Sequence, residues 1–140
     1  MSKLSSTLNP DIGILFLRIA TGGLMVFHGI GKLIQGHDFV KEALTEKGLP
    51  SFLWIGAPIG EILAPILLIL GIFSRLSGLM IAVVMVFALY VGHGMQAFTV
   101  TDTGGLDGEL AFLYMFSGIA IYFMGGGKYV LYKVKNEMLQ

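Results

Sequence analysis

Apolar residues run through the chain in four long stretches, with short polar segments between them. Each stretch reaches or approaches the roughly 20 residues that a helix needs to cross a hydrocarbon core of about 30 Å. A membrane β-barrel would show short alternating segments, so the continuous runs favour helices. We expect helices over about 12–31, 52–73, 76–95 and 106–127. The pattern predicts an all-α fold, a polytopic membrane four-helix bundle that forms a single domain over residues 1–140.

The segment from about 37 to 48 follows a different pattern. Its apolar side chains share one face of a helix, and its charged side chains share the other. The apolar face holds Phe39, Val40, Ala43 and Leu44, and the polar face holds Lys41, Glu42 and Glu46. We therefore expect a short helix here that lies in the membrane interface rather than across the bilayer.

Basic residues are distributed unevenly between the two sides that four spans would create. The side with both termini carries Lys3, Arg75, Lys128, Lys133 and Lys135, and the other side carries Lys32, Lys41 and Lys47. Cytoplasmic segments of membrane proteins are enriched in Lys and Arg. The count of five against three predicts that the N- and C-termini are cytoplasmic.

Composition excludes several classes of function. Hydrophobic residues make up 55% of the chain and charged residues only 13%, against a usual charged share of about a quarter. The formal net charge is zero, so no basic surface predicts nucleic-acid binding. Cysteine is absent, which rules out disulfides, thiol catalysis, and zinc or iron–sulfur sites held by cysteine.

Two charged residues fall inside the apolar stretches. Arg18 lies about 10 Å into the first predicted helix at 1.5 Å per residue, and Glu61 lies near the middle of the second. Charges at membrane depth are expensive and are usually paired or line a pathway. We expect Arg18 and Glu61 to face one another inside the bundle. Three interpretations stay open: a structural ion pair, a polar cavity that binds a small molecule, or a snorkelling arginine beside a protonated glutamate.

The second predicted helix has two distinct faces. Isoleucines repeat along one face and suit lipid, whereas small residues share the other face with Glu61. Small residues let a neighbouring helix approach closely, so Glu61 should point into the bundle. Pro58 and Pro65 flank it and remove backbone donors, which predicts a kink and free carbonyls close by.

A second polar group should gather toward the non-cytoplasmic side, namely His28, Lys32, Asp102, Asp107, His93 and Glu109. Two His and a Glu could ligate a metal, but no single helix carries a metal-binding spacing, and interfacial polar residues at helix ends explain the group better. We predict no metal site. His28 is deeper and could hydrogen-bond a quinone carbonyl. Nearby aromatic residues either form a wall of that site or face lipid: Phe112, Phe116, Tyr122 and Phe123.

Three motifs occur in a recognisable order. The first runs from Leu17 to Leu33 as an Arg, an apolar run, and His-Gly-Ile-Gly-Lys. The second is Gly60-Glu61 followed by an apolar run into Gly-Ile-Phe-Ser-Arg, which ends at Arg75. The third joins Glu109-Leu-Ala to Gly-Gly-Gly-Lys-Tyr near the end of the last helix. In order and spacing they resemble the DoxX family of small four-helix membrane proteins.

The resemblance covers about residues 12–133 and departs from the family at its C-terminal end. Relatives often read Gly-Pro-Gly-Lys/Arg-Tyr-Ser-Leu-Asp there, whereas this chain has Gly126, Val130 and Tyr132. Family members are linked to membrane oxidoreductases, and some are subunits of a thiosulfate:quinone oxidoreductase. The resemblance carries over five polar positions without supplying a reaction: Arg18, His28, Lys32, Glu61 and Glu109.

The sequence thus leads to one functional hypothesis with an alternative beside it. We expect a multi-pass protein of the bacterial inner membrane that binds a quinone or another lipophile as a subunit of a membrane oxidoreductase system. Its expected partners are the lipid bilayer and oxidoreductase subunits, with homo-oligomers left open. The alternative is a non-enzymatic scaffold, assembly factor or small transporter. The expected ligand-binding residues are Arg18, His28, Lys32, Glu61, His93 and Glu109, and no catalytic residue is assigned.

Overall fold

A computed structural model describes residues 8–140, which form helices joined by turns and loops, with no β-strand among them. Lys3, which the charge count used, lies outside them. Within the described residues the all-α prediction is confirmed, and one isolated antiparallel bridge joins Val100 to Leu106 in a loop. The helices in chain order are α1 (Pro10–Gln35), α2 (Asp38–Glu46), η1 (Ser51–Ile55), α3 (Gly56–Pro58), η2 (Ile59–Leu63), α4 (Ala64–Leu70), α5 (Ser74–Phe87), η3 (Ala88–His93), η4 (Gly94–Phe98) and α6 (Glu109–Met124).

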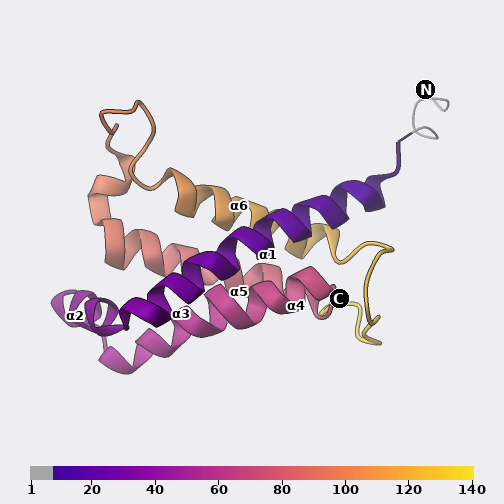
Figure 1. Cartoon of the computed structure of the whole chain (residues 1–140), viewed down its shortest axis with the longest axis horizontal. Coiled ribbons are helices and arrows are strands. Elements are labelled where there is room, and N and C mark those ends of the chain that lie inside the picture. The colour runs from indigo at the N-terminus through magenta and orange to yellow at the C-terminus, as the bar shows by residue number, and fades with distance from the viewer. Residues whose placement is uncertain (1–7) are drawn as a thin grey trace.

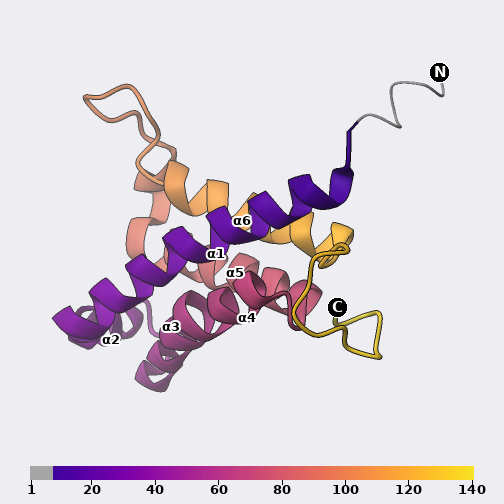
Figure 2. The ribbon, with the colours of Figure 1, turned by 45° about the vertical axis from the view of Figure 1, so that its right-hand side comes forward.

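The bundle has two different ends (Figure 1). One is the terminal end, which gathers the start of α1, the end of α4 and the segment 125–140 (Figures 1 and 2). The other is the loop end, which gathers α2, η1 and the loop 99–108. Helices η1 through α4 form one continuous segment, and α5 through η4 form another. Both ends of the described chain therefore lie on the same side of the bundle.

Three helical segments are long and apolar enough to cross a membrane: Pro10–Gln35, Ser51–Leu70 and Ser74–Phe98. Helix α6 is apolar but has only 16 residues, about 24 Å at 1.5 Å per residue. It is shorter than the predicted 106–127 because Gly125 turns left-handed at φ 77° and stops it. The prediction of a helical membrane protein is confirmed at this level, and the fourth crossing stays a prediction.

The segment 51–70 is helical but irregular, as its two prolines predict. Pro65 has no N–H, so the carbonyl of Glu61 lacks its usual partner four residues on. The backbone widens instead into the π-helical turn η2, whose closing bond runs from the Ala64 N–H to the Ile59 carbonyl. Such single wide turns inside helices occur frequently at functional sites.

Close contacts at glycines set how the helices pack. A Cβ atom on Gly22 would lie 2.8 Å from the Pro65 carbonyl, and one on Gly29 would lie 2.5 Å from the Glu61 carbonyl. Helix α1 therefore rests directly on the backbone of η2 and α4. Helices α5 and α6 meet in the same way at Gly78 and Gly118, as small residues allow between membrane helices. The hydrophobic core of the bundle draws on α1, α4, α5 and α6 and contains Met25, Ala64, Leu68, Ile81, Met85, Ala111, Tyr114 and Ile121.

The last carbonyls of α4 have no partner within the helix and must find one elsewhere. At the terminal end, the Leu131 N–H donates to the Leu70 carbonyl at 2.8 Å, and the Gln140 side chain donates to Gly71 at 2.8 Å. Arg75 does the same for α6 and donates to the carbonyls of Tyr122 at 2.6 Å and Phe123 at 2.9 Å. The helix ends are thus closed by hydrogen bonds from distant parts of the chain.

Candidate functional site

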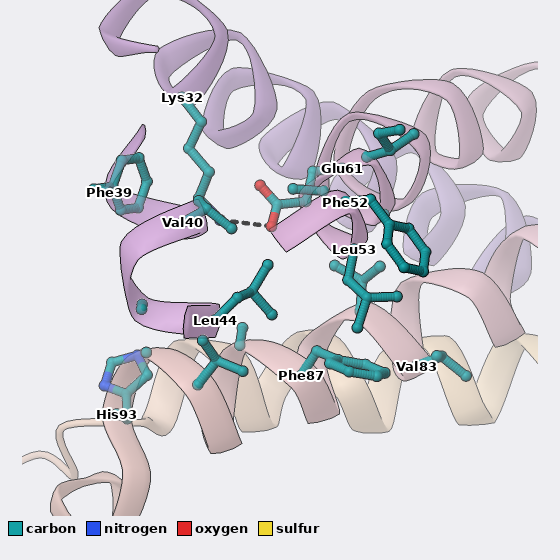
Figure 3. A pocket seen from close by; sticks show the side chains of 18 residues that line it. Lys32, Phe39, Val40, Leu44, Phe52, Leu53, Glu61, Val83, Phe87 and His93 are labelled. Carbon is teal, nitrogen blue, oxygen red and sulfur yellow. Dashed lines mark hydrogen bonds and ion pairs between the residues drawn. The ribbon is translucent and has the colours of Figure 1, made fainter. Parts of the chain in front are cut away.

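A large cavity lies at the loop end, between α2, the segment 51–61 and the second half of the segment 74–98 (Figure 3). Its volume is about 620 Å³, within the roughly 300–1,000 Å³ range of small-molecule sites. Apolar side chains from three elements form most of its wall, among them Val40, Leu44, Leu53, Val83 and Phe87. Only three of its lining side chains are charged or titratable, namely Lys32, Glu61 and His93.

Lys32 and Glu61 form an ion pair in the wall of this cavity (Figure 3). The Lys32 Nζ atom lies 2.6 Å from Oε1 of Glu61. The glutamate is only 2% exposed and the lysine 29%. The second carboxylate oxygen, Oε2, is buried and has no hydrogen-bond partner. An unmet buried carboxylate oxygen is unfavourable, and Glu61 therefore keeps one hydrogen-bond acceptor without a donor.

The backbone explains why this pair forms where it does. Glu61 sits at the centre of the wide turn η2, and Gly29 lets α1 touch the Glu61 backbone directly. Lys32 follows Gly29 by about one helical turn, which places its side chain along the same face of α1. Its flexible stem then reaches the carboxylate across the helix interface. The proline, the glycine and the lysine together build one polar corner in an apolar cavity.

A second wide turn borders the same cavity. The π-helical turn η3 contributes Ala88, Val91, Gly92 and His93 to the wall. The His93 Nδ1 atom lies 2.6 Å from Oδ2 of Asp107 in the loop that precedes α6. Both members of this pair are partly exposed. The cavity therefore has a buried pair on one side and a more accessible pair on the other.

Helix α2 covers the cavity and has a glycine at each end. Gly36 and Gly48 adopt φ values of 85° and 71°, a left-handed region that favours glycine. At its start, the ring of His37 packs 4.9 Å from Trp54, and the Lys41 Nζ lies 5.2 Å from the same indole ring. On the outer face, Lys41 donates to Asp38 at 2.9 Å and lowers the pKa of that carboxyl. These contacts attach α2 to η1 above the cavity.

The expected contact between Arg18 and Glu61 is wrong. Arg18 is 1% exposed and points to the terminal end. It donates to the carbonyls of Leu68 (2.9 Å), Ile69 (3.1 Å), Gly126 (2.6 Å) and Tyr129 (2.7 Å). The reason is the register of α1, because Gly22 packs on Pro65 and Gly29 on Glu61. That register places Arg18 beside the end of α4 and brings Lys32 to Glu61.

The remaining predicted residues lie outside the cavity wall. His28 is exposed on another face of α1, with its ring 6.2 Å from that of Tyr114. Glu109 is exposed in the first turn of α6. The aromatic residues of α6 do not line the large cavity either: Phe116 and Phe123 face outward, as lipid-facing side chains do, and Phe112 packs 5.4 Å from Phe98. Across residues 8–140, no three His, Asp or Glu side chains converge as metal ligands would.

Of the residues predicted from the sequence, Lys32, Glu61 and His93 line this cavity, whereas the cavity itself and the lysine–glutamate pairing were not predicted. The missed signal was the pair of glycines on α1, seven residues apart on one face. Aligned with the small and proline positions of the second helix, Gly22 and Gly29 indicate the antiparallel register. The apolar wall from α2 had no such signal, since its docking depends on tertiary packing.

Comparison with known proteins identifies the family to which this chain belongs. Residues 13–94, which include Lys32, Glu61 and His93, match the DoxX family. A Haemophilus influenzae protein described as "Uncharacterized protein" is 31% identical over 116 residues, which cover 80% of this chain and 82% of that protein. A Bacillus subtilis protein named "Putative oxidoreductase CatD" is 30% identical over 79 residues, 56% of this chain and 58% of its own length. No solved structure matches significantly. The chain is a member of the DoxX family.

Proposed function

We propose that this protein binds the head group of a membrane quinone in the loop-end cavity, as a subunit of an oxidoreductase system in the bacterial inner membrane. In this proposal the chain crosses the bilayer four times with cytoplasmic termini, so the cavity lies near the opposite face. The observation that carries the proposal is a cavity of about 620 Å³ with apolar walls and one buried ion pair, Lys32–Glu61.

The chemistry of the wall fits such a head group. A quinone ring is flat and largely apolar, with oxygen atoms at opposite positions, and suits a cavity whose walls are mainly aliphatic and aromatic. The Lys32 ammonium can donate to one of those oxygens, and the Glu61 carboxylate can hold or release a proton beside it. Because Glu61 is only 2% exposed, a hydrogen bond to its carboxylate contributes more there than at a surface.

The cavity also faces the lipid phase. Phe52, Val83 and Phe87 line it and are at the same time exposed on the outside of the bundle. Exposed apolar side chains of a membrane helix contact lipid rather than water. A ligand with an isoprenoid tail can therefore enter sideways from the bilayer, with the head group at Lys32–Glu61 and the tail between η1 and α5.

Electron transfer requires a partner in this proposal. The chain has no cysteine, and the residues around the cavity offer binding and proton exchange rather than a redox centre. A bound quinone supplies the capacity to accept two electrons and two protons, while Lys32 and Glu61 orient its oxygen. The name of the Bacillus subtilis relative, "Putative oxidoreductase CatD", supports this direction.

The test uses the only tryptophan, Trp54, which lies between two cavity-lining residues, Leu53 and Ile55. The protein is purified into lipid nanodiscs and titrated with a decyl-chain benzoquinone while Trp54 fluorescence is recorded. We expect saturable quenching, together with quinone in an organic extract of the purified protein identified by mass spectrometry. Quenching that rises linearly without saturation, together with an extract free of quinone, would contradict the proposal.

A matched pair of variants localises the binding. Lys32→Met keeps the length of the side chain and removes the donor, so the saturable quenching should be lost. Glu137→Gln changes an exposed residue of the terminal end and should quench like the parent protein. Equal quenching in both variants would place the quinone elsewhere in the protein or in the lipid.

A further inference from the structure

The polar corner of the cavity offers one donor and one free acceptor at the same place. Lys32 Nζ is 2.6 Å from Oε1 of Glu61, whereas Oε2 of the same carboxylate is buried without a partner. A lysine ammonium can only donate hydrogen bonds, and an ionised carboxylate can only accept them. A complementary ligand group must therefore accept from Lys32 and donate to Glu61.

A hydroxyl group meets both requirements with a single oxygen atom. Its lone pairs accept from the ammonium, and its O–H donates to the carboxylate. A carbonyl oxygen accepts from Lys32 but leaves Oε2 of Glu61 unpaired. The terminal torsion of a glutamate is broad and soft, so the carboxylate can turn either oxygen toward the cavity that it lines.

We propose that this cavity selects the hydroxyl-bearing form of its ligand, so that it binds a quinol in preference to the matching quinone. The inference rests on the proposed function, because it concerns the same site and ligand class. The structure assigns the selectivity to one residue: Glu61 provides the acceptor that a quinol uses and a quinone cannot. Lys32 contacts the ligand oxygen in both forms and contributes to both affinities.

The test compares four ligands on the unaltered protein in nanodiscs under anaerobic conditions. They are a decyl-chain benzoquinone, its quinol, the monomethyl ether of the quinol and the dimethyl ether. Affinities follow from displacement of the quinone, seen as recovery of Trp54 fluorescence. A hydrogen bond to a charged group predicts a preference of about tenfold for the quinol. The monomethyl ether should keep most of that preference, and the dimethyl ether should lose it.

One variant should reverse the preference. In Glu61→Gln the amide oxygen accepts from Lys32, which leaves the NH₂ group as the free position. That group donates, so it suits a carbonyl, and the quinone should then bind more tightly than the quinol. Glu137→Gln makes the same chemical change at an exposed site and should keep the parent preference.

The outcomes separate the inference from the function beneath it. If quinone and quinol bind the parent protein equally, or the quinone binds more tightly, the selectivity is refuted while quinone binding stands. The latter result would indicate that Glu61 does not accept a hydrogen bond from the ligand. If none of the four ligands gives saturable displacement, the proposed function fails as well. The four ligands are compared on the parent protein. The preference for quinol can therefore be tested even if the Glu61→Gln protein misfolds.

Discussion

Two buried charges, one at each end of the bundle, are surrounded in opposite ways. At the terminal end, Arg18 makes four hydrogen bonds to four backbone carbonyls at 2.6 to 3.1 Å. At the loop end, Glu61 makes one side-chain bond, to Lys32, and its Oε2 atom has none. Both side chains are at most 2% exposed. Burial alone therefore does not distinguish them, whereas hydrogen-bond completeness does.

The difference indicates different roles for the two ends. A buried charge is tolerated when it is hydrogen-bonded, and Arg18 uses four of the five N–H groups of its guanidinium to join α1, α4 and the segment 125–140. Glu61 lines a cavity, and one of its carboxylate oxygens has no hydrogen-bond partner. This arrangement is expected when a ligand supplies the missing hydrogen bond. The terminal end joins the helices by hydrogen bonds, and the loop end is where our proposal places ligand recognition.

The largest effect should come from removing the guanidinium in Arg18→Met. Four carbonyls then lose a donor, two of them in the buried part of the network, those of Leu68 and Gly126, and unmet buried groups each cost about 1–3 kcal/mol. We expect a loss of about 3–5 kcal/mol in the free energy of unfolding, seen as a strongly lowered unfolding temperature in detergent. Methionine preserves most of the side-chain volume, so packing changes little.

The control for this change is Lys128→Met. It removes a positive charge from the same end, where Lys128 is exposed and its side chain makes no recorded hydrogen bond. We expect a change below about 0.5 kcal/mol. A mild Arg18→Met phenotype, comparable to that of Lys128→Met, would mean that the carbonyl network does not hold the terminal end together.

Gly29→Ala should disturb the interface between α1 and η2. It should therefore lower stability and weaken ligand binding together. The new Cβ atom would lie 2.5 Å from the Glu61 carbonyl oxygen and 2.9 Å from its carbon, both of them backbone atoms. We expect about 2–3 kcal/mol of destabilisation from the forced separation, together with weaker quinone binding because Glu61 moves. Gly23→Ala is the matched control, since nothing lies within 4 Å of its added Cβ. If both variants unfold at the parent temperature, the close approach is not needed.

Lys32→Met should have a smaller effect on stability and a larger one on binding. It leaves the Glu61 carboxylate buried without its only partner, but Lys32 itself is 29% exposed. We expect about 1–2 kcal/mol of destabilisation, between the values for exposed and buried pairs. The double variant Lys32→Met/Glu61→Gln should recover much of that stability, because it removes the unpaired charge, while quinone binding stays lost. Recovery of quinone binding in the double variant would mean that the Lys32–Glu61 pair is not part of the ligand site.

How far the sequence predicts this molecule depends on the length scale of each feature. The apolar stretches predict helices well because a membrane span needs about 20 residues of one kind. The prolines around Glu61 predict the irregular helix, since the missing N–H groups are a local property. The end of α6 is predicted less well, because a single left-handed glycine, Gly125, determines it.

The candidate site is only partly predictable from the sequence. Charge and depth identify Lys32 and Glu61 as unusual, but which cation pairs with Glu61 depends on the sliding register of two helices. Bringing Arg18 to Glu61 instead would require α1 to slide by about 14 residues, roughly 21 Å at 1.5 Å per residue, and the contacts at Gly22 and Gly29 exclude it. The outer wall of the cavity depends on where α2 docks, and a nine-residue amphipathic helix fits many apolar surfaces.

The smallest stability effect should come from Asp107→Asn at the accessible edge of the loop end. The His93–Asp107 pair is short at 2.6 Å, but both side chains are partly exposed, and such pairs contribute about 0–1 kcal/mol. We expect an unfolding temperature within a degree or two of the parent and quinone quenching reduced by less than threefold, because His93 keeps its place in the wall. Thermal unfolding and Trp54 titration of the same sample measure both quantities. A large loss of stability would mean that the loop end depends on its charges for folding, as the terminal end does. The number of hydrogen bonds at a buried charge would then not distinguish a structural role from ligand binding in this bundle.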